Sequence, residues 1–294
     1  MMRLSIVIPN YNSGPVLERA IRSILDQDYP HVQVIVADSA SHDISRQIIE
    51  RFRPSLDTVI SEKDEGQADG LNKGFAHARG ELRGWLCADD ELLPGALRHV
   101  ASAFEECSDA DVVIGCCERV FPDGSTSITP ARADTWDMIG VQNVVDQPSV
   151  FWRATLHRRL GALDTSYQLA FDWDFWCRMR DAGAKLIIVD RVLSRYHFTS
   201  TNKSGNAGRQ HAEESFRVVR RYGPLRGGLA HVFRFLYYAF DLRGCYDRPQ
   251  TCGKFRAALF AASLAVLRLV IGRRFLFSYN WHFASCQERG LRWW

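Results

Sequence analysis

The sequence predicts an α/β fold with a parallel sheet, followed by a C-terminal helical extension of different composition. Two observations support this prediction: strand-like and helix-like segments alternate through the first part of the chain, and charge is divided unequally between the two parts. The short apolar or β-branched runs that predict strands are 4–9, 32–37, 57–60 and 83–87.

Helical spacing of apolar residues fills the stretches between these runs, as at Val16, Ala20, Ile21, Ile24 and Leu25. Helix-start signals precede the helical stretches, at Ser13, Pro15, Asp43 and Pro94. Such a βαβ series predicts a nucleotide-binding half-sheet. The turn after the first strand has no G-x-G-x-x-G pattern, which disfavours a dinucleotide-dependent dehydrogenase.

The chain has 294 residues, 46% of them hydrophobic, enough for one large core or for one core with an appended segment. The N-terminus enters the first strand without a signal-peptide pattern, so we expect a cytoplasmic protein. The eight cysteines show no metal-binding spacing, and we expect them to be reduced and mostly buried.

The net charge of +3 combines two different surfaces. Residues 217–294 hold 14 Lys and Arg against three acids, a balance of +11, and the rest of the chain holds 23 against 31, a balance of −8. This C-terminal part is also rich in Phe, Tyr and Trp, a composition typical of proteins at anionic membrane surfaces. A nucleic-acid binder would share the basic and aromatic composition, but the acidic remainder of the chain makes that alternative unfavourable, and we expect no nucleic-acid partner.

Two helices are expected in the C-terminal part, around 229–242 and 255–272. The apolar run 257–272 rises only about 24 Å, less than the roughly 30 Å of a bilayer core. We expect an interfacial or re-entrant membrane anchor. The alternative is a helical subdomain that packs on the remainder of the protein or forms a dimer.

The pair Asp89-Asp90 follows the fourth predicted strand directly. Two carboxylates at the carboxyl end of a strand indicate a site for Mg²⁺ or Mn²⁺, which usually takes its other ligands from water and substrate phosphates. The alternative is that the two acids stabilise the start of the following helix.

Several ordered segments resemble the family 2 glycosyltransferases of the GT-A fold. The resemblance covers roughly the first 200 residues and does not reach the C-terminal part. The segments are 5–12 (SIVIPNYN), 34–43 (VIVADSASHD), 64–74 (DEGQADGLNKG), 85–90 (WLCADD), 147–152 (QPSVFW), 171–178 (FDWDFWCR) and 195–197 (RYH).

The resemblance implies a Rossmann-like mixed sheet flanked by helices in a domain of residues 1–222. Within it, 1–115 would bind a nucleotide-sugar and 116–222 the acceptor, and 223–294 would form the C-terminal helical segment that associates with a membrane or packs. The resemblance also implies that the nucleotide is held by Pro9, Asn10, Tyr11, Asn12 and Asp38. The carboxylate of Asp38 can accept a hydrogen bond from a base, or it can simply cap its own turn.

The segment 64–74 opens a helix that the resemblance assigns to the nucleotide-sugar through Gln67, Asp69, Asn72 and Lys73. The last three share one helix face. Lys73 could offset diphosphate charge and Asp69 could bind sugar hydroxyls. Alternatively, Asp69 and Lys73 form an ordinary helix ion pair.

The family pattern makes Asp90 the direct metal ligand, Asp89 a partner that contacts ribose or metal, and His197 a residue that reaches the metal or diphosphate. The expected cofactor is Mg²⁺ or Mn²⁺. Family members often have a polar residue at the position of Ala88, so one hydrogen bond near the metal is missing here.

The catalytic base is expected at Asp172, with Asp174 as the second candidate, and one of the two could instead cap its helix. This implies an inverting transfer from a UDP-, GDP- or dTDP-linked sugar to a glycan or lipid-linked acceptor. The expected setting is cell-surface polysaccharide or glycolipid assembly, peripheral on the inner face of the membrane. The alternative function is a catalytically silent GT-A protein that binds nucleotide-sugar or acts as a scaffold.

Overall fold

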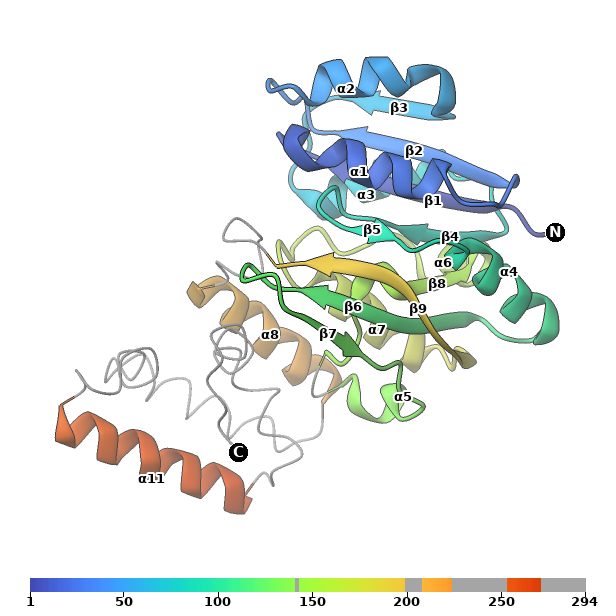
Figure 1. Ribbon diagram of the computed structural model, residues 1–294. Coiled ribbons are helices and arrows are strands. Elements are labelled where there is room, and N and C mark those ends of the chain that lie inside the picture. The colour runs from blue at the N-terminus through green and yellow to red at the C-terminus, as the bar shows by residue number, and fades with distance from the viewer. Residues whose placement is uncertain (141–142, 199–207, 224–252, 271–294) are drawn as a thin grey trace. The chain divides into compact units, whose positions relative to one another are not determined.

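The computed structural model describes residues 1–140, 143–198, 208–223 and 253–270 (Figure 1). By its contacts the chain divides into two compact units, Met1–Trp136 with Val144–Asn202, and Asp137–Asn143 with Lys203–Trp294. The domain boundaries expected from the sequence, after residues 115 and 222, stay predictions.

One nine-stranded sheet forms the centre of the first unit in its described residues, in the order β3-β2-β1-β4-β8-β6-β9-β5, with β7 paired to β6. The strands are β1 Leu4–Asn10, β2 Val32–Asp38, β3 Thr58–Ser61, β4 Leu82–Trp85, β5 Glu91–Leu92, β6 Val112–Val120, β7 Thr126–Thr129, β8 Val150–Arg153 and β9 Leu186–His197. The helices are α1 Gly14–Leu25, α2 Ser45–Phe52, α3 Gln67–Ala76, α4 Ala96–Glu106, α5 Thr135–Met138, which crosses into the second unit, α6 Ala154–Leu160 and α7 Phe171–Asp181, with short 3₁₀ turns η1 Arg53–Ser55 and η2 Gln147–Ser149.

The amino-terminal half of the sheet is parallel. β1 pairs with β2 and with β4, and β2 pairs with β3, all in parallel. These are the four strands predicted from sequence, and their positions are confirmed within two residues. The order of pairing changes direction between β3 and β4, because β2 lies on one side of β1 and β4 on the other. In open α/β sheets ligands bind at such a switch point, beyond the carboxyl ends of the strands.

Side chains along β1 point alternately to the two faces of the sheet, and their contacts show which helices cover each face. Leu4, Ile6 and Ile8 belong to the same buried core as the apolar residues of α1, α2 and α4. Val7 points to the other face, where Gly74 of α3 lies so close that a Cβ built there would be 2.4 Å from the Val7 Cγ1. Right-handed crossovers predict this division, because the chain first moves one way along the sheet and then returns. Figure 1 shows α1 in front of the parallel strands and α3 behind them.

The second half of the sheet is mixed. β8 is antiparallel to β4 and to β6, β9 is parallel to β6, and β5 is antiparallel to β9. This agrees with the Rossmann-like mixed sheet expected from the resemblance.

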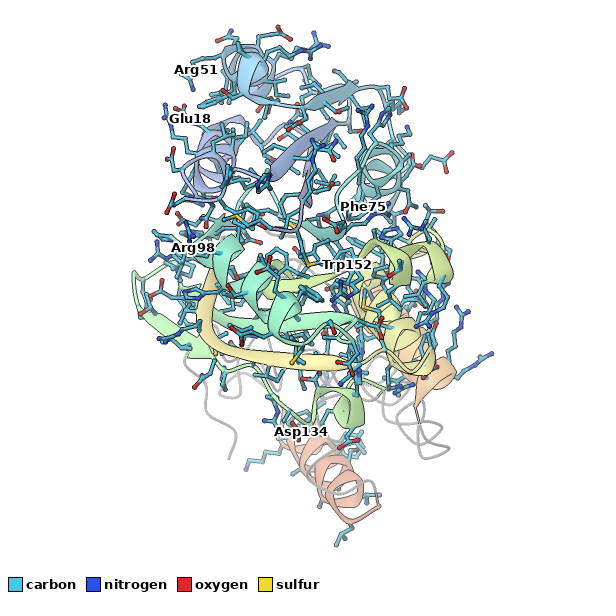
Figure 2. The ribbon with its side chains drawn as sticks, turned by 90° about the vertical axis from the view of Figure 1, so that its right-hand side faces the viewer. Glu18, Arg51, Phe75, Arg98, Asp134 and Trp152 are labelled. Carbon is cyan, nitrogen blue, oxygen red and sulfur yellow. The ribbon has the colours of Figure 1, made fainter. Side chains whose placement is uncertain are left out.

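An aromatic cluster packs α7 against the centre of the sheet. Trp85 of β4 stacks on Trp176 of α7, with ring centroids 5.2 Å apart and planes 7° from parallel. Phe75 of α3 meets Trp152 of β8 at 5.7 Å, and both are labelled inside the molecule in Figure 2. Phe175 of α7 contacts Trp152 at 5.6 Å. The cluster therefore fixes α7, and with it Asp172, relative to the end of β4.

The second unit contains helices α8 Gly208–Tyr222 and α11 Lys254–Val270 among its described residues. Helix α11 agrees with the helix predicted around 255–272, whereas the helix predicted around 229–242 lies outside the described residues. Among the residues that the structure describes, no helix has the length and apolar character needed to cross a membrane.

Candidate active site

Polar residues gather where the parallel strands end. Asn10 ends β1 and is the register partner of Asp38, which ends β2. Asp89 and Asp90 follow β4, the strand on the other side of β1. Parallel pairing therefore brings the three groups that sequence analysis assigned to nucleotide and metal to one edge of the sheet.

The carboxylate of Asp38 lies in a closed hydrogen-bond network. Asn10 Nδ2 donates to Asp38 Oδ1 at 2.7 Å, and the backbone N–H of Ser41 and the hydroxyl of Ser61 donate to Oδ2 at 3.0 and 3.1 Å. The bond from Ser41 closes the turn after β2, so Asp38 has the capping role proposed as its alternative. Asn10 Oδ1 is buried beside this network without a hydrogen-bond partner. An acceptor atom is therefore present at this position in addition to the carboxylate.

The turn after β1 is tied to the turn after β2. Asn12 adopts a left-handed conformation, with φ of 51°, and its backbone N–H donates to the Ser41 hydroxyl at 2.8 Å. Its side-chain oxygen accepts from the backbone N–H of His42 at 3.0 Å. Pro9 lies inside β1, and Tyr11 is exposed at the turn, edge-on to the His42 ring. The turn thus presents Tyr11 to solvent on a rigid base.

Helix α3 begins after Gly66, whose φ of 130° favours glycine. Lys73 pairs with Asp69 at 3.3 Å and with Glu62 at 3.1 Å, and it donates to the Lys63 carbonyl at 2.8 Å. The hydrogen bond to Glu62, followed by that to Asp69, raises the pKa of Lys73 despite some desolvation. The helix ion pair considered as the alternative role for Asp69 and Lys73 is therefore present.

Asn72 connects α3 to the loop before α7. Its side-chain nitrogen donates to the Leu163 carbonyl at 2.9 Å, and its side-chain oxygen accepts from the Leu163 N–H at 2.8 Å. The Asn72 side chain therefore links α3 to the loop before α7 through the backbone of Leu163.

Cys87 forms hydrogen bonds with side chains from two elements. Gln67 Nε2, at the start of α3, donates to its sulfur at 3.2 Å, and the thiol donates to Gln147 Oε1 of η2 at 3.3 Å. Gln147 Nε2 in turn donates to the Trp85 carbonyl at 2.8 Å. Burial raises the pKa of Cys87 well above its usual value, and the carboxylates of Asp90, Asp89 and Asp172 raise it further. The cysteine is therefore a neutral thiol close to all three acids.

Asp90 has the features of a metal ligand. It is 1% exposed, its Oδ1 accepts from the backbone N–H of His197 at 3.2 Å, and its Oδ2 is buried without a hydrogen-bond partner. Burial, and then repulsion from Asp89, raise the pKa of Asp90 well above its usual value. Ligand atoms of Cys87, Asp89 and Asp90 lie within 4.8 Å of one another. A divalent cation would satisfy the unpaired oxygen and offset both carboxylates, so these residues fit such an ion.

His197 ends β9 beside Asp90. Its Nε2 meets Glu91 Oε1 at 2.7 Å, and Glu91 also pairs with Arg195 at 3.3 Å and with Arg19 at 3.8 Å. Burial would raise the pKa of Glu91, but His197, Arg195 and Arg19 together lower it, so Glu91 is ionised.

The two candidate bases on α7 have different surroundings. The Asp174 side chain is fully buried, and its Oδ2 accepts from Arg178 Nε at 2.9 Å. Arg178 also donates to the carbonyls of Leu160 and Ala162. Asp172 is half-buried, and its charge acts on Cys87. Asp174 therefore holds α7 in place, while Asp172 is one of the charges that raise the pKa of Cys87.

Three residues of this region were not assigned from sequence: Cys87, Glu91 and Gln147. The cysteine was expected only to be reduced and buried like the others, and it lies beside the carboxylates of Asp89 and Asp90. Glu91 directly follows Asp90, and Gln147 opens one of the segments that resemble the family, so each had a positional signal. As expected, none of the five cysteines in the described residues is in a disulfide: Cys87, Cys107, Cys116, Cys117 and Cys177.

A comparison with family models decides the class of protein. The model described as "Glycosyl transferase family 2" matches residues 5–182, more than half of the chain. The chain belongs to glycosyl transferase family 2. This is the family predicted from the segments above.

Curated relatives of this glycosyltransferase match over part of their length. It is 35% identical over 107 residues to an uncharacterized glycosyltransferase of Nostoc sp., a match that covers 35% of this chain and 33% of the relative. A match at 24% identity covers 68% of this chain and 66% of an uncharacterized glycosyltransferase of Rickettsia typhi. A third match, at 34% identity over 101 residues, covers 33% of each chain, and that relative is the GalNAc(5)-diNAcBac-PP-undecaprenol beta-1,3-glucosyltransferase of Campylobacter jejuni.

Solved structures share the fold of this glycosyltransferase. The mannosyltransferase PcManGT from Pyrobaculum calidifontis, in complex with GDP-Man and Mn²⁺, has a TM-score of 0.61 at 19% identity, covering 98% of this chain and 86% of that one. S. aureus TarS 1-349 in complex with UDP has a TM-score of 0.58 at 18% identity, covering 100% of this chain and 93% of that one. These likenesses confirm the GT-A fold.

Proposed function

We propose that this glycosyltransferase moves a sugar from a nucleoside diphosphate sugar to a hydroxyl acceptor, with inversion, and depends on Mg²⁺ or Mn²⁺. The observation that carries this proposal is the buried, unpaired Oδ2 of Asp90 beside Asp89, with Asp172 near enough to act on the same thiol. The complexes of PcManGT with GDP-Man and Mn²⁺ and of TarS with UDP-GlcNAc support a donor of this class.

The nucleotide is assigned to the ends of β1 and β2. Pro9, Asn10, Tyr11 and Asn12 form one wall, in which exposed Tyr11 offers a ring to the base. Asp38 and the unpaired Asn10 Oδ1 are acceptors that suit the N–H edge of a base. The start of α3 is assigned to the diphosphate and sugar through Gln67, Asp69, Asn72 and Lys73.

The ion is assigned to Asp90 and Asp89, with His197 as a further ligand. When bound there, it would supply positive charge that offsets the charge developing on the leaving nucleoside diphosphate. Carboxylate oxygens and one imidazole are a donor set that suits Mg²⁺ or Mn²⁺.

The base is assigned to Asp172, with Asp174 as the group that keeps α7 in position. Asp172 takes the proton from the acceptor hydroxyl while the hydroxyl oxygen bonds to the anomeric carbon. The bond from that carbon to the diphosphate oxygen breaks on the opposite face, which inverts the configuration. Positive charge on the sugar ring is expected in the transition state, as in glycoside hydrolysis.

A binding experiment tests the donor assignment. Thermal stabilisation of the full chain is measured with UDP-, GDP- and dTDP-sugars, with and without Mn²⁺, for wild type and Asp90→Ala. We expect one nucleotide class to raise Tm in wild type and the Mn²⁺-dependent part of the rise to be lost in Asp90→Ala. If no nucleotide changes Tm under any condition, the donor assignment is wrong, and the scaffold function gains support.

The acceptor is proposed to be a glycan or a lipid-linked glycan at an anionic membrane surface, in cell-surface polysaccharide or glycolipid assembly. The name of the Campylobacter jejuni relative states a polyprenol-linked substrate, which supports this class. On α11, Phe255, Val266 and Leu269 are 72%, 58% and 85% exposed, and Lys254 and Arg256 are exposed beside Phe255. Apolar and basic residues exposed on one helix favour an anionic bilayer interface.

Vesicle flotation tests the membrane assignment. We expect the full chain to float with vesicles that contain phosphatidylglycerol, and more weakly with pure phosphatidylcholine. The double variant Phe255→Ser, Leu269→Ser should reduce flotation. The matched control is Ile128→Ser, because Ile128 is 60% exposed on β7. Equal flotation of wild type and the double variant would contradict an anchor at α11.

A further inference from the structure

Arg83 is a buried arginine with no acidic partner in the part of the chain that the structure describes. It lies on β4, inside the sheet, and 8% of its surface is exposed. Its Nε is buried without a hydrogen-bond partner, and its Nη2 donates to the Ala78 carbonyl at 3.4 Å. Because a guanidinium stays protonated in proteins, this position always holds a positive charge.

The groups that act on Arg83 add positive charge rather than negative charge. Burial, and then repulsion from Arg158 of α6, lower the pKa of Arg83. After burial, the charge of Arg83 is the next cause that lowers the pKa of His157, the neighbour of Arg158, so α6 lies beside the buried guanidinium. The acid nearest in sequence, Glu81, is exposed and accepts a hydrogen bond from the backbone N–H of Arg3 at 3.1 Å. Two arginines therefore repel each other here without an acid of the described residues to offset them.

The contact of Arg83 with Phe75 offsets only part of this charge. The guanidinium carbon lies 5.9 Å from the centroid of the Phe75 ring, which Figure 2 labels. The attraction of a cation to an aromatic face is weak compared with the cost of removing an isolated charge from water. Arginines are almost never this deeply buried unless they are paired. The missing negative charge is therefore expected to come from outside the described residues.

Arg83 lies away from the residues assigned to the donor. Register pairs it with Ser5 of β1 and with Trp152 of β8, whereas the residues assigned to the nucleotide begin at Pro9. Four residues of strand separate Ser5 from Pro9, a distance of about 13 Å. An anion at Arg83 would therefore lie outside the proposed diphosphate site.

We propose that Arg83 and Arg158 form a binding site for a small oxyanion of the phosphate type. The planar fork of a guanidinium matches two oxygens of a phosphate group, and such an anion would give Arg83 Nε an acceptor. It would also offset the repulsion between the two arginines. The anion must be small, because Arg83 is more than nine-tenths buried on an inner strand. This inference goes beyond the proposed function and does not depend on it.

Calorimetric titration of the full chain with inorganic phosphate tests the site. The titration is done in EDTA, at constant ionic strength kept with sodium chloride, for wild type, Arg83→Met, Arg158→Met and Arg46→Met. We expect saturable binding of one phosphate to wild type, weakened about 10- to 100-fold in Arg83→Met and about 10-fold in Arg158→Met. Arg46→Met is the matched control, because Arg46 is exposed on α2, and it should bind as wild type does.

Urea unfolding distinguishes an anion site from an arginine that serves only packing. Without phosphate, Arg83→Met should be at least as stable as wild type, because it replaces an uncompensated buried charge by an apolar side chain of similar length. With saturating phosphate, wild type should gain stability and the variant should not. If Arg83→Met is less stable than wild type by the same amount in both conditions, the arginine is a packing residue and the inference is wrong.

Lys73→Met separates this site from the proposed diphosphate site. We expect Lys73→Met to bind inorganic phosphate as wild type does. If Lys73→Met abolishes binding while Arg83→Met leaves it unchanged, phosphate binds at the donor site, and the inference is wrong while the donor assignment gains support. Absence of saturable phosphate binding to wild type would also overturn the inference, and it would leave the donor assignment unaffected.

Discussion

Asp172 and Asp174 lie on one helical turn of α7 but differ in burial and in charged partners. Asp174 is buried and paired with Arg178, whereas Asp172 is half-buried near Cys87. Sequence spacing already indicates that residues two apart diverge on a helix. The structure adds that Asp174 is paired with Arg178, whereas the charge of Asp172 helps to raise the pKa of Cys87.

Exchange of each acid for its amide separates the two roles. Asp172→Asn removes the proposed base but leaves the helix intact, so we expect transfer to fall about 10²- to 10⁴-fold with little change in Tm. Asp174→Asn leaves Arg178 without its charged partner, so we expect the free energy of unfolding to fall by about 3 kcal/mol. Steady-state rates and urea unfolding check the two effects. A large loss of stability in Asp172→Asn with unchanged turnover would contradict the assignment.

His157 gives the fold a defined dependence on pH. Its ring is 6% exposed, accepts a hydrogen bond from Trp152 Nε1 at 3.1 Å and packs against Phe75. Burial, aided by the charges of Arg83 and Arg178, lowers the pKa of His157 from 6.5 to about 3. Between these values the unfolded chain binds a proton that the folded chain does not, so stability falls as pH decreases.

The His157→Gln variant should lose this dependence, because glutamine can accept from Trp152 and does not titrate. We expect stability of wild type to fall with decreasing pH more steeply than that of the variant, by about 1.4 kcal/mol per pH unit well below pH 6.5. Urea unfolding at pH 8, 7, 6 and 5 measures both slopes. The prediction fails if the slopes are equal between pH 6 and pH 5.

At the residue scale, sequence reasoning named the residues to which the proposed function assigns the chemistry, but it did not name all of the residues that they contact. Asp38, Asp89 and Asp90 follow apolar strands, a local signal that needs no tertiary contact to be read. Glu91 and Gln147 act through contacts 106 and 60 residues away in the chain. Such partners depend on pairing between β5 and β9 and on the position of η2, which no local pattern specifies.

Among the elements, α3 packs closely against β1 at Gly74. A Cβ on Gly74 would lie 2.4 Å from Val7 Cγ1, closer than real carbon atoms approach. Glycine at this position allows α3 to pack against β1, and the same helix carries Gln67, which contacts Cys87 after β4, and Asn72, which contacts Leu163.

Gly74→Ala should force α3 away from β1 and lower the free energy of unfolding by about 2 kcal/mol. Donor affinity should fall as well, because Gln67 and Asn72 move with the helix. The double variant Val7→Ala, Gly74→Ala removes the obstructing methyl groups, so we expect it to recover part of both losses. Calorimetry and donor titration measure them. If the double variant is less stable than Gly74→Ala alone, the close approach is not the cause.

Strand positions were predicted most accurately where the sequence contains a short run of apolar and β-branched residues. The four parallel strands have short β-branched runs, and each was found within two residues of its expected position. In the second half, β6 and β8 were not among the predicted strands. Their place between β4 and β9 depends on long-range pairing rather than on local composition.

At the scale of the whole molecule, the mixed sheet brings the residues assigned to the nucleotide and those assigned to the metal to one edge. Its parallel half ends in the groups assigned to the nucleotide, and β9 returns from the other half with His197 beside Asp90. Between them, Asn72 and Cys87 link α3 to the loop before α7 and to η2. The GT-A fold is confirmed, whereas the charge contrast between the two parts of the chain supports the membrane proposal only through composition.

Release of nucleoside diphosphate from the donor, with the metal controlled, tests the central claim most directly. Wild type and Asp90→Asn are incubated with the stabilising donor, with Mn²⁺ and then with EDTA, and the released nucleoside diphosphate is quantified. We predict release by wild type with Mn²⁺, its loss on chelation, and little release by Asp90→Asn at any Mn²⁺ concentration. Equal release by the two proteins, or release that persists in EDTA, would contradict a metal-dependent transferase centred on Asp90.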